Sequence, residues 1–255
     1  MKNDRFVKSP NLPQTPVTLC VCSDGDIAAK LEKHGIEVIK CVPSPFLDAE
    51  LSAHPDMQLC HLGYGLIVAD CFQANMIKKL REHGFDVIEA PSACGLYPDN
   101  IRFNGAVCGG FLFGRTDKLA DEITDNAAKQ NIMSVYVRQG YAKCSICTVS
   151  ERAVITEDAG IAKAAERLGF DVLTIEKGDI FLSREHYGFI GGCSGKISAD
   201  TVAFTGTLDS HRDGERIKIF LKKHRCRPLE LSDNIMKDTG GILPIKEEKD
   251  VYTRN

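Results

Sequence analysis

The sequence predicts an α/β protein in which five β-β-α-β repeats form a ring, a fivefold pseudo-symmetric α/β propeller. Three observations predict this fold. A helix followed by a short strand recurs along the chain, a pair of strands precedes most of these helices, and the two chain ends each hold part of one further unit. The length agrees, because five units of about 51 residues fill the 255 residues of the chain.

The recurring helix is amphipathic, ends near a glycine or a polar residue, and is followed by a short apolar strand. Three runs match closely, namely LEKHGIEVIK (31–40), LREHGFDVIE (80–89) and AERLGFDVLT (165–174). Two looser matches are AAKQNIMSVYV (127–137) and LKKHRCRPLEL (221–231). The same position in the five units is marked by Gly35, Gly84, Asn131, Gly169 and Arg225.

Two strands joined by a turn containing Gly or Ser are expected before each of the last four helices. The four segments are MQLCHLGYGLIVAD (57–70), IRFNGAVCGGFLFGR (101–115), AKCSICTVSERAVITED (142–158) and GFIGGCSGKISADTVAFTG (188–206). The repeating unit is therefore β-β-α-β.

The fifth unit is divided between the chain ends. Residues 17–40 hold one strand before their helix, and GGILPI (240–245) is a strand with no helix after it. Pairing the two closes the ring and leaves no free sheet edge. The alternative is a doubly wound α/β sheet, which suits the hairpins poorly. We expect one domain over residues 17–245, between polar segments at 1–16 and 246–255.

The composition is that of an ordinary globular protein, with 43% apolar and 26% charged residues. A formal net charge of −3 provides no basic field for nucleic acid or an anionic membrane. No apolar run approaches the roughly 20 residues that cross a bilayer. The 11 cysteines are an odd set without an apolar leader before them, which predicts reduced thiols in the cytoplasm.

Five such units resemble the pentein fold, the α/β propeller of arginine deiminases, dimethylarginine hydrolases and amidinotransferases. ISADTVAFTGTLD (197–209) is similar to the His-x-Asp-Thr-Val-Phe-Thr segment of arginine deiminases. DTGGILPI (238–245) corresponds to their final Gly-Gly, nucleophilic Cys and Pro. The resemblance covers residues 17–245 and is closer still to a family of uncharacterised bacterial proteins assigned to this fold.

The chain lacks two catalytic groups of the enzymes that it resembles. Ser198 replaces the general-acid His ahead of the matching Asp200, and residues 240–244 contain no Cys. These differences favour a central cleft that binds a small polar or amino-acid-like ligand without the usual deiminase catalysis. A further alternative is a noncatalytic interaction module, similar to the ribosome anti-association members of the fold.

An enzymatic alternative is a divergent cysteine-dependent hydrolase or transferase acting on C–N bonds of guanidino or amidino groups. Its nucleophile would be Cys193, because the neighbouring glycines allow a substrate to approach closely. His61 or His186 would carry the proton and Asp200 would orient it.

The resemblance implies that the first strand of each hairpin lies nearest the ring axis, where a ligand would bind. The ligand-binding candidates are Arg102, Asn104, Cys147, His186, Gly191 and Gly192. Asn104 cannot neutralise a guanidinium, which argues against a strongly cationic ligand at that point. Cys144 and Cys147 form a C-x-x-C that we expect inside a strand, facing opposite sides, so neither a metal site nor a cofactor is predicted.

Overall fold

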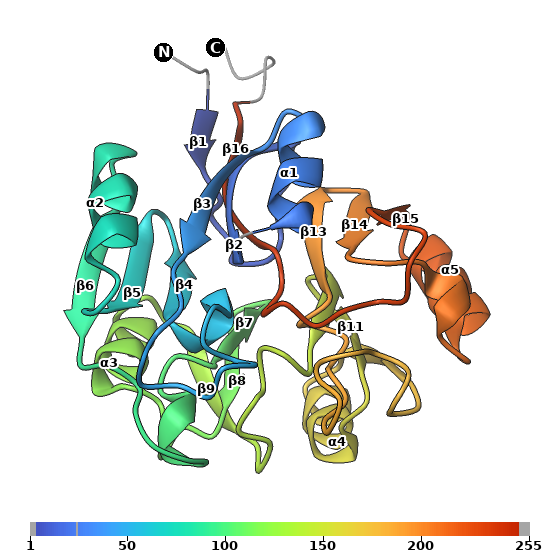
Figure 1. The fold of residues 1–255 in the computed structure, drawn as a ribbon. Coiled ribbons are helices and arrows are strands. Elements are labelled where there is room, and N and C mark those ends of the chain that lie inside the picture. The colour runs from blue at the N-terminus through green and yellow to red at the C-terminus, as the bar shows by residue number, and fades with distance from the viewer. Residues whose placement is uncertain (1–3, 24, 250–255) are drawn as a thin grey trace.

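The computed structural model describes residues 4–23 and 25–249, and its strands form five small sheets arranged around a centre, with the helices on the outside (Figure 1). This arrangement confirms the predicted ring of five repeats. The side chains between neighbouring sheets form the core, as where Leu19, Ile67 and Leu80 pack in one buried cluster.

Four complete units follow one another along the chain. In each unit, the first two strands pair antiparallel and the third strand pairs parallel with the second. The units are β4 (Leu59–Gly63), β5 (Leu66–Asp70), α2 (Ala74–Glu82) and β6 (Asp86–Ala90); β7 (Ala106–Cys108), β8 (Phe111–Gly114), α3 (Asp121–Lys129) and β9 (Met133–Tyr136); β10 (Cys147–Ser150), β11 (Ala153–Thr156), α4 (Ala159–Arg167) and β12 (Asp171–Thr174); and β13 (Ser194–Ser198), β14 (Thr201–Phe204), α5 (Gly214–Lys223) and β15 (Arg227–Glu230).

The fifth unit is assembled from both ends of the chain, as predicted. Its strands and helix are β16 (Leu243–Glu248), β2 (Val17–Ser23), α1 (Asp26–Lys33) and β3 (Glu37–Cys41). Strand β16 pairs antiparallel with β2, and β3 pairs parallel with β2 on its other side. The closing strand therefore occupies the place that the first hairpin strand has in the other units.

The sheet of this unit extends beyond the predicted domain bounds. Strand β1 (Asp4–Phe6) pairs antiparallel with the outer part of β16, and Val7 and Leu12 are almost completely buried. The segment before residue 17 thus contributes both a strand and core side chains, because its few apolar residues, Val7 and Leu12 among them, pack inside the protein.

All five helices end in the same way, which explains why the repeat is visible in the sequence. The residue marking each unit has a positive φ, between +57° at Arg225 and +86° at Gly84. The next residue donates its backbone N–H to the carbonyl five residues earlier, as Ile36 does to Leu31. This is the Schellman arrangement, in which a left-handed residue satisfies the last carbonyls and turns the chain into the following strand.

The first strands of the hairpins meet at the ring axis. Strand β13 contacts β10 and β16, β16 contacts β4, and β4 contacts β7. The residues immediately before these strands are consequently brought together at the hub, although they are far apart in sequence. Three short 3₁₀ turns also occur, at Pro55–Met57, Asp99–Ile101 and Leu208–Ser210.

Within the described ranges, we find no helix with the length and apolar character needed to cross a membrane.

Replacing a side chain of the closing strand tests the ring closure. Ile245 in β16 is fully buried, so Ile245→Ala should lower the free energy of unfolding by about 2–5 kcal/mol. Ile219 on α5 is 67% exposed, so Ile219→Ala should change the free energy of unfolding by less than about 0.5 kcal/mol. Urea denaturation followed by circular dichroism measures both, and equal effects would contradict the closed ring.

Candidate functional site

A cleft of about 360 Å³ opens between residues 48–51 and residues 182–189 and reaches down to Cys144 and Asp238. We call it the acidic cleft, because the described residues that line it include four carboxylates and no Lys or Arg. The four are Asp48, Glu50, Glu185 and Asp238. Asp48 and Glu185 are exposed at the mouth, whereas Asp238 and Cys144 are buried at the floor.

His186 forms one ion pair across the mouth of the acidic cleft. Its Nδ1 lies 2.9 Å from Oε1 of Glu50. Burial alone would raise the pKa of Glu50, but hydrogen bonds from Ser183 and His186 lower it overall. The Glu50 carboxylate is therefore ionised and joins the two sides of the opening.

Three aromatic rings line the same cleft. The rings of Tyr141 and Phe189 are stacked at 6.2 Å, and Tyr187 meets Phe189 edge-on at 5.8 Å. Asn100 donates a hydrogen bond of 3.0 Å to the Tyr141 hydroxyl and fixes that ring. Aromatic faces beside carboxylates favour a positively charged ligand.

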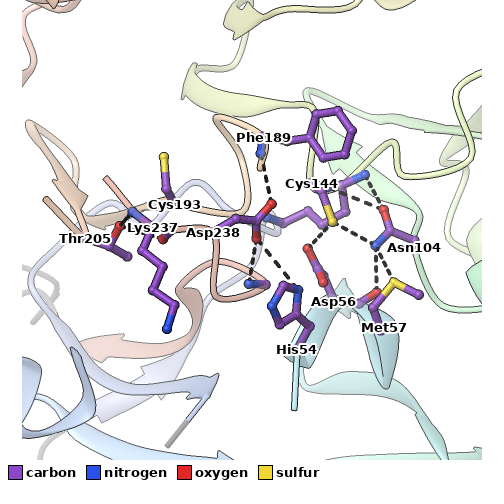
Figure 2. Close-up of polar contacts among 12 residues, drawn as sticks. His54, Asp56, Met57, Asn104, Cys144, Phe189, Cys193, Thr205, Lys237 and Asp238 are labelled. Atoms are coloured by element: carbon purple, nitrogen blue, oxygen red, sulfur yellow. Dashed lines mark hydrogen bonds and ion pairs between the residues drawn. The ribbon is translucent and has the colours of Figure 1, made fainter. Parts of the chain in front are cut away.

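At the floor, the Cys144 thiol is held between a carboxylate and an amide (Figure 2). Its Sγ donates to Oδ2 of Asp56 at 2.9 Å and accepts from Nδ2 of Asn104 at 3.2 Å. Burial raises the pKa of the thiol well above its usual range, and burial also raises the pKa of Asp56 to about 6. The resting thiol is therefore protonated, and the nearest group able to accept its proton is the Asp56 carboxylate.

Asp238 is fixed in place by backbone groups of two loops. It accepts hydrogen bonds from the N–H of Phe189 at 2.9 Å and of Gly240 at 3.0 Å. Its Oδ1 also lies 3.7 Å from Nδ1 of His54, a buried atom that has no hydrogen-bond partner. A Cβ on Gly192 would overlap the Asp238 carboxylate, so the close approach of this loop depends on glycine.

The side chain of Asn104 bonds to other residues of the floor. It is fully buried, its Oδ1 accepts from the Lys143 N–H at 2.8 Å, and its Nδ2 donates to the Asp56 carbonyl at 3.2 Å. These bonds, with the one to Cys144, occupy the amide and give no support to the ligand-binding role expected for Asn104, which stays a prediction.

The structure does not bring together the predicted catalytic set Cys193, His61 and Asp200. Cys193 points into the apolar core, with its Sγ near the Ile190 carbonyl and Met236, and Figure 2 shows the sulfur turned away from Asp238. Its pKa is raised well above the usual range, mainly by burial.

The other two members of that set lie elsewhere. Asp200 is exposed at the β13–β14 turn and accepts hydrogen bonds from Ser198 and Thr201. His61 lines a separate hollow of about 20 Å³ with Lys143 and Cys60, and burial lowers the pKa of His61 to about 4. These placements remove the physical basis for the predicted trio.

Of the predicted ligand-binding residues, His186 lines the acidic cleft and the remainder do not. Cys147 begins β10 inside the core, and burial raises its pKa to about 11. Gly191 packs against the carbonyls of the turn before β10, and Gly192 packs against Asp238. Arg102 follows the second 3₁₀ turn, away from the residues that line the cleft.

The sequence-based reasoning missed His54, Asp56, Cys144 and Asp238 as a group. A usable signal was present, because Asp56 and Cys144 each lie three residues before the first strand of a unit, at Leu59 and Cys147. Cys144 also lies in a turn before β10 rather than inside a strand as predicted. All eleven cysteines are free, and in the described part of the chain no three His, Cys, Asp or Glu residues are grouped as metal ligands.

A family model described as "Family of unknown function (DUF6873)" matches residues 22–243, and the chain belongs to this family. No curated protein matches the chain.

Solved structures with the same fold have little sequence identity to this chain. An inosamine-phosphate amidinotransferase from Streptomyces griseus is 12% identical with a TM-score of 0.61, covering 98% of this chain and 99% of its own. An amidinotransferase of saxitoxin biosynthesis from Microseira wollei is 10% identical with a TM-score of 0.59, covering 97% of this chain and 98% of its own. Agmatine deiminase from C. jejuni is 9% identical with a TM-score of 0.55, covering 98% of both. The chain has the pentein fold.

The raised pKa of Asp56 predicts a specific dependence of stability on pH. Its folded-state pKa of about 6 lies above the usual 3.8, so the folded protein holds this proton more tightly than the unfolded chain. The resulting stabilisation is complete below pH 4 and is lost as the pH rises to about 6, a change of about 3 kcal/mol. Asp56→Asn removes this contribution, because an amide does not titrate.

Urea unfolding of the wild type and of Asp56→Asn at several pH values measures this effect. The wild type should lose stability relative to the variant between about pH 4 and pH 6. Asp125→Asn, on the exposed face of α3, is the matched control. A difference between wild type and Asp56→Asn that stays constant over this range would contradict the assignment.

Proposed function

We propose that this DUF6873 member binds a small organic cation in the acidic cleft, without the catalysis usual for deiminases. The observation that supports the proposal is the charge of the lining, which has four carboxylates and no Lys or Arg. A neutral or anionic ligand would leave these charges uncompensated, whereas a cation would pair with them.

The chemistry of the lining favours guanidinium, amidinium and ammonium groups. Planar guanidinium matches carboxylates bidentately, and the rings of Tyr141, Tyr187 and Phe189 offer faces on which it can stack. Amidinotransferases and an agmatine deiminase share the fold, so guanidino compounds are the first ligands to test. Asn104 does not oppose this choice, since it lies behind Cys144 and its amide is already bonded.

The absence of deiminase catalysis is supported by the residues themselves. Ser198 is on β13, outside the acidic cleft, and the segment before β16 consists of Gly240, Gly241 and Ile242 with no Cys. We also propose a cytoplasmic location, which eleven free thiols support because reducing compartments keep cysteines in this state.

A second candidate function is covalent chemistry at Cys144, and the contact between its thiol and Asp56 favours it. In that reaction Asp56 takes the thiol proton, and the sulfur forms a bond to the electrophilic carbon of a bound amidinium. The amine then leaves as the C–N bond breaks, and it takes the proton that Asp56 had accepted. A bound cation beside Cys144 would favour the thiolate form of its sulfur, which offsets the burial that raises the pKa of the thiol.

Calorimetric titration with methylguanidine, agmatine and arginine tests the binding proposal. At least one should bind saturably, and Glu185→Gln at the cleft mouth should weaken that binding several-fold because one charge is lost. Asp238→Asn at the floor should weaken it about 10–100-fold, the usual worth of a charge-assisted hydrogen bond. Glu166→Gln on the exposed face of α4 is the control. Absence of saturable binding across the panel would refute the proposal.

Alkylation with 2-chloroacetamidine and with its neutral analogue 2-chloroacetamide tests the covalent candidate. The exposed Cys71 and Cys94 should react with both reagents. Cys144 should react faster with the cationic reagent, lose this preference in Asp56→Asn, and be protected by a bound guanidino ligand. Peptide mass spectrometry assigns each site. Labelling of Cys71 and Cys94 alone would exclude Cys144 as a nucleophile for amidinium carbon.

A further inference from the structure

The carboxylates of the acidic cleft lie at two different depths. Asp238 is almost completely buried at the floor, where Cys144 and Asp56 lie beside it. Asp48 and Glu185 are exposed at the mouth. The negative charge therefore has an inner and an outer centre rather than one.

The outer centre stays negative after its internal contacts are taken into account. His186 contacts one carboxylate, that of Glu50, with its Nδ1 2.9 Å from Oε1. Within the described residues, the side-chain carboxylates of Asp48 and Glu185 form no hydrogen bond or ion pair. Two charges thus remain at the mouth, close to the opening through which a ligand enters.

Lys143, Arg184 and Lys237 line other hollows than the acidic cleft. Lys143 lies behind the floor, in the hollow that contains His61. Arg184 lines an open hollow that shares Glu185, His186 and Tyr187 with the acidic cleft, and Lys237 lines a third hollow beside α1. None of the five helices begins among the residues that line the acidic cleft, so no helix N-terminus supplies positive charge there.

A carboxylate on the ligand would therefore meet carboxylates of the same sign at the mouth and no compensating cation. The α-carboxylate of an amino acid such as arginine would be repelled, while an amine at the same place would be attracted. The wall of the cleft also contains the apolar groups of Leu51, Leu182 and the ring of Phe189. That surface suits a short methylene chain.

We infer that the ligand of the acidic cleft is a linear dication without a carboxylate, a diamine or guanidinoalkylamine whose inner cation faces Asp238 and whose outer ammonium faces Asp48 and Glu185. This inference rests on the proposed binding of an organic cation and adds the class of cation. It replaces the amino-acid-like ligand expected from the sequence by its decarboxylated counterpart.

Calorimetric titration with matched ligand pairs tests the inference. Agmatine and arginine differ by one carboxylate, as do cadaverine and lysine. The decarboxylated member of a pair should bind at least tenfold more tightly than the other member. Agmatine should also bind more tightly than the monocation methylguanidine. Glu185→Gln should reduce the preference for agmatine over arginine, and Glu185→Arg should shift it towards arginine. Glu166→Gln, remote from the cleft, should leave the ratio unchanged.

The outcomes separate this inference from the proposal on which it rests. Equal binding of agmatine and arginine, or of agmatine and methylguanidine, would overturn the dication and leave cation binding intact. Tighter binding of arginine than of agmatine would overturn the dication as well. If agmatine, arginine, cadaverine and methylguanidine all fail to bind to the folded wild type, the binding of a cation itself is refuted.

Discussion

Five strands that converge on one axis force the residues in front of them into burial, whatever their polarity. At the hub this places Asp56, Asn104 and Cys144 in direct contact. Buried polar groups are costly unless they bond to one another, and Asn104 supplies most of the bonds that these residues make. The floor of the acidic cleft is therefore a consequence of ring geometry, satisfied by one central amide.

Backbone N–H groups hold the other half of the floor, and a glycine leaves the space that they need. Asp238 receives two backbone N–H bonds, and the absence of a Cβ at Gly192 lets the loop before β13 come close enough to supply one of them. A carboxylate fixed in this way needs no lysine or arginine partner. It keeps its charge available to a ligand, which is what electrostatic recognition by a preformed site requires.

The repeat could be predicted from the sequence because each of its parts is local. A positive φ after every helix needs Gly or a tolerant residue such as Asn131. The hairpins are recognisable from alternating apolar and polar residues and from the residue types typical of turns. The split fifth unit followed from counting strands. These features depend on neighbours within a few positions, so one sequence was sufficient to locate them.

The site was predicted less well because contacts across the ring decide it. Cys193 has glycines around it, but the turn before β13 directs its sulfur into the core beside Met236. Cys144 shares a C-x-x-C with Cys147, yet only the ring brings it against Asp56, which is 88 residues away in sequence. His186 could be singled out because it is polar and sits in a loop ahead of a hairpin, where exposure to a ligand is common.

The division of one sheet between the two chain ends bears on how the protein is made. During synthesis β2 leaves the ribosome well before its antiparallel partner β16, because four complete units lie between them in the chain. Until then one side of β2 is an unpaired sheet edge, the kind of surface that attracts other strands. The nascent chain must keep that edge solvated or shielded by a chaperone while four units fold, and the ring closes only once β16 has followed them.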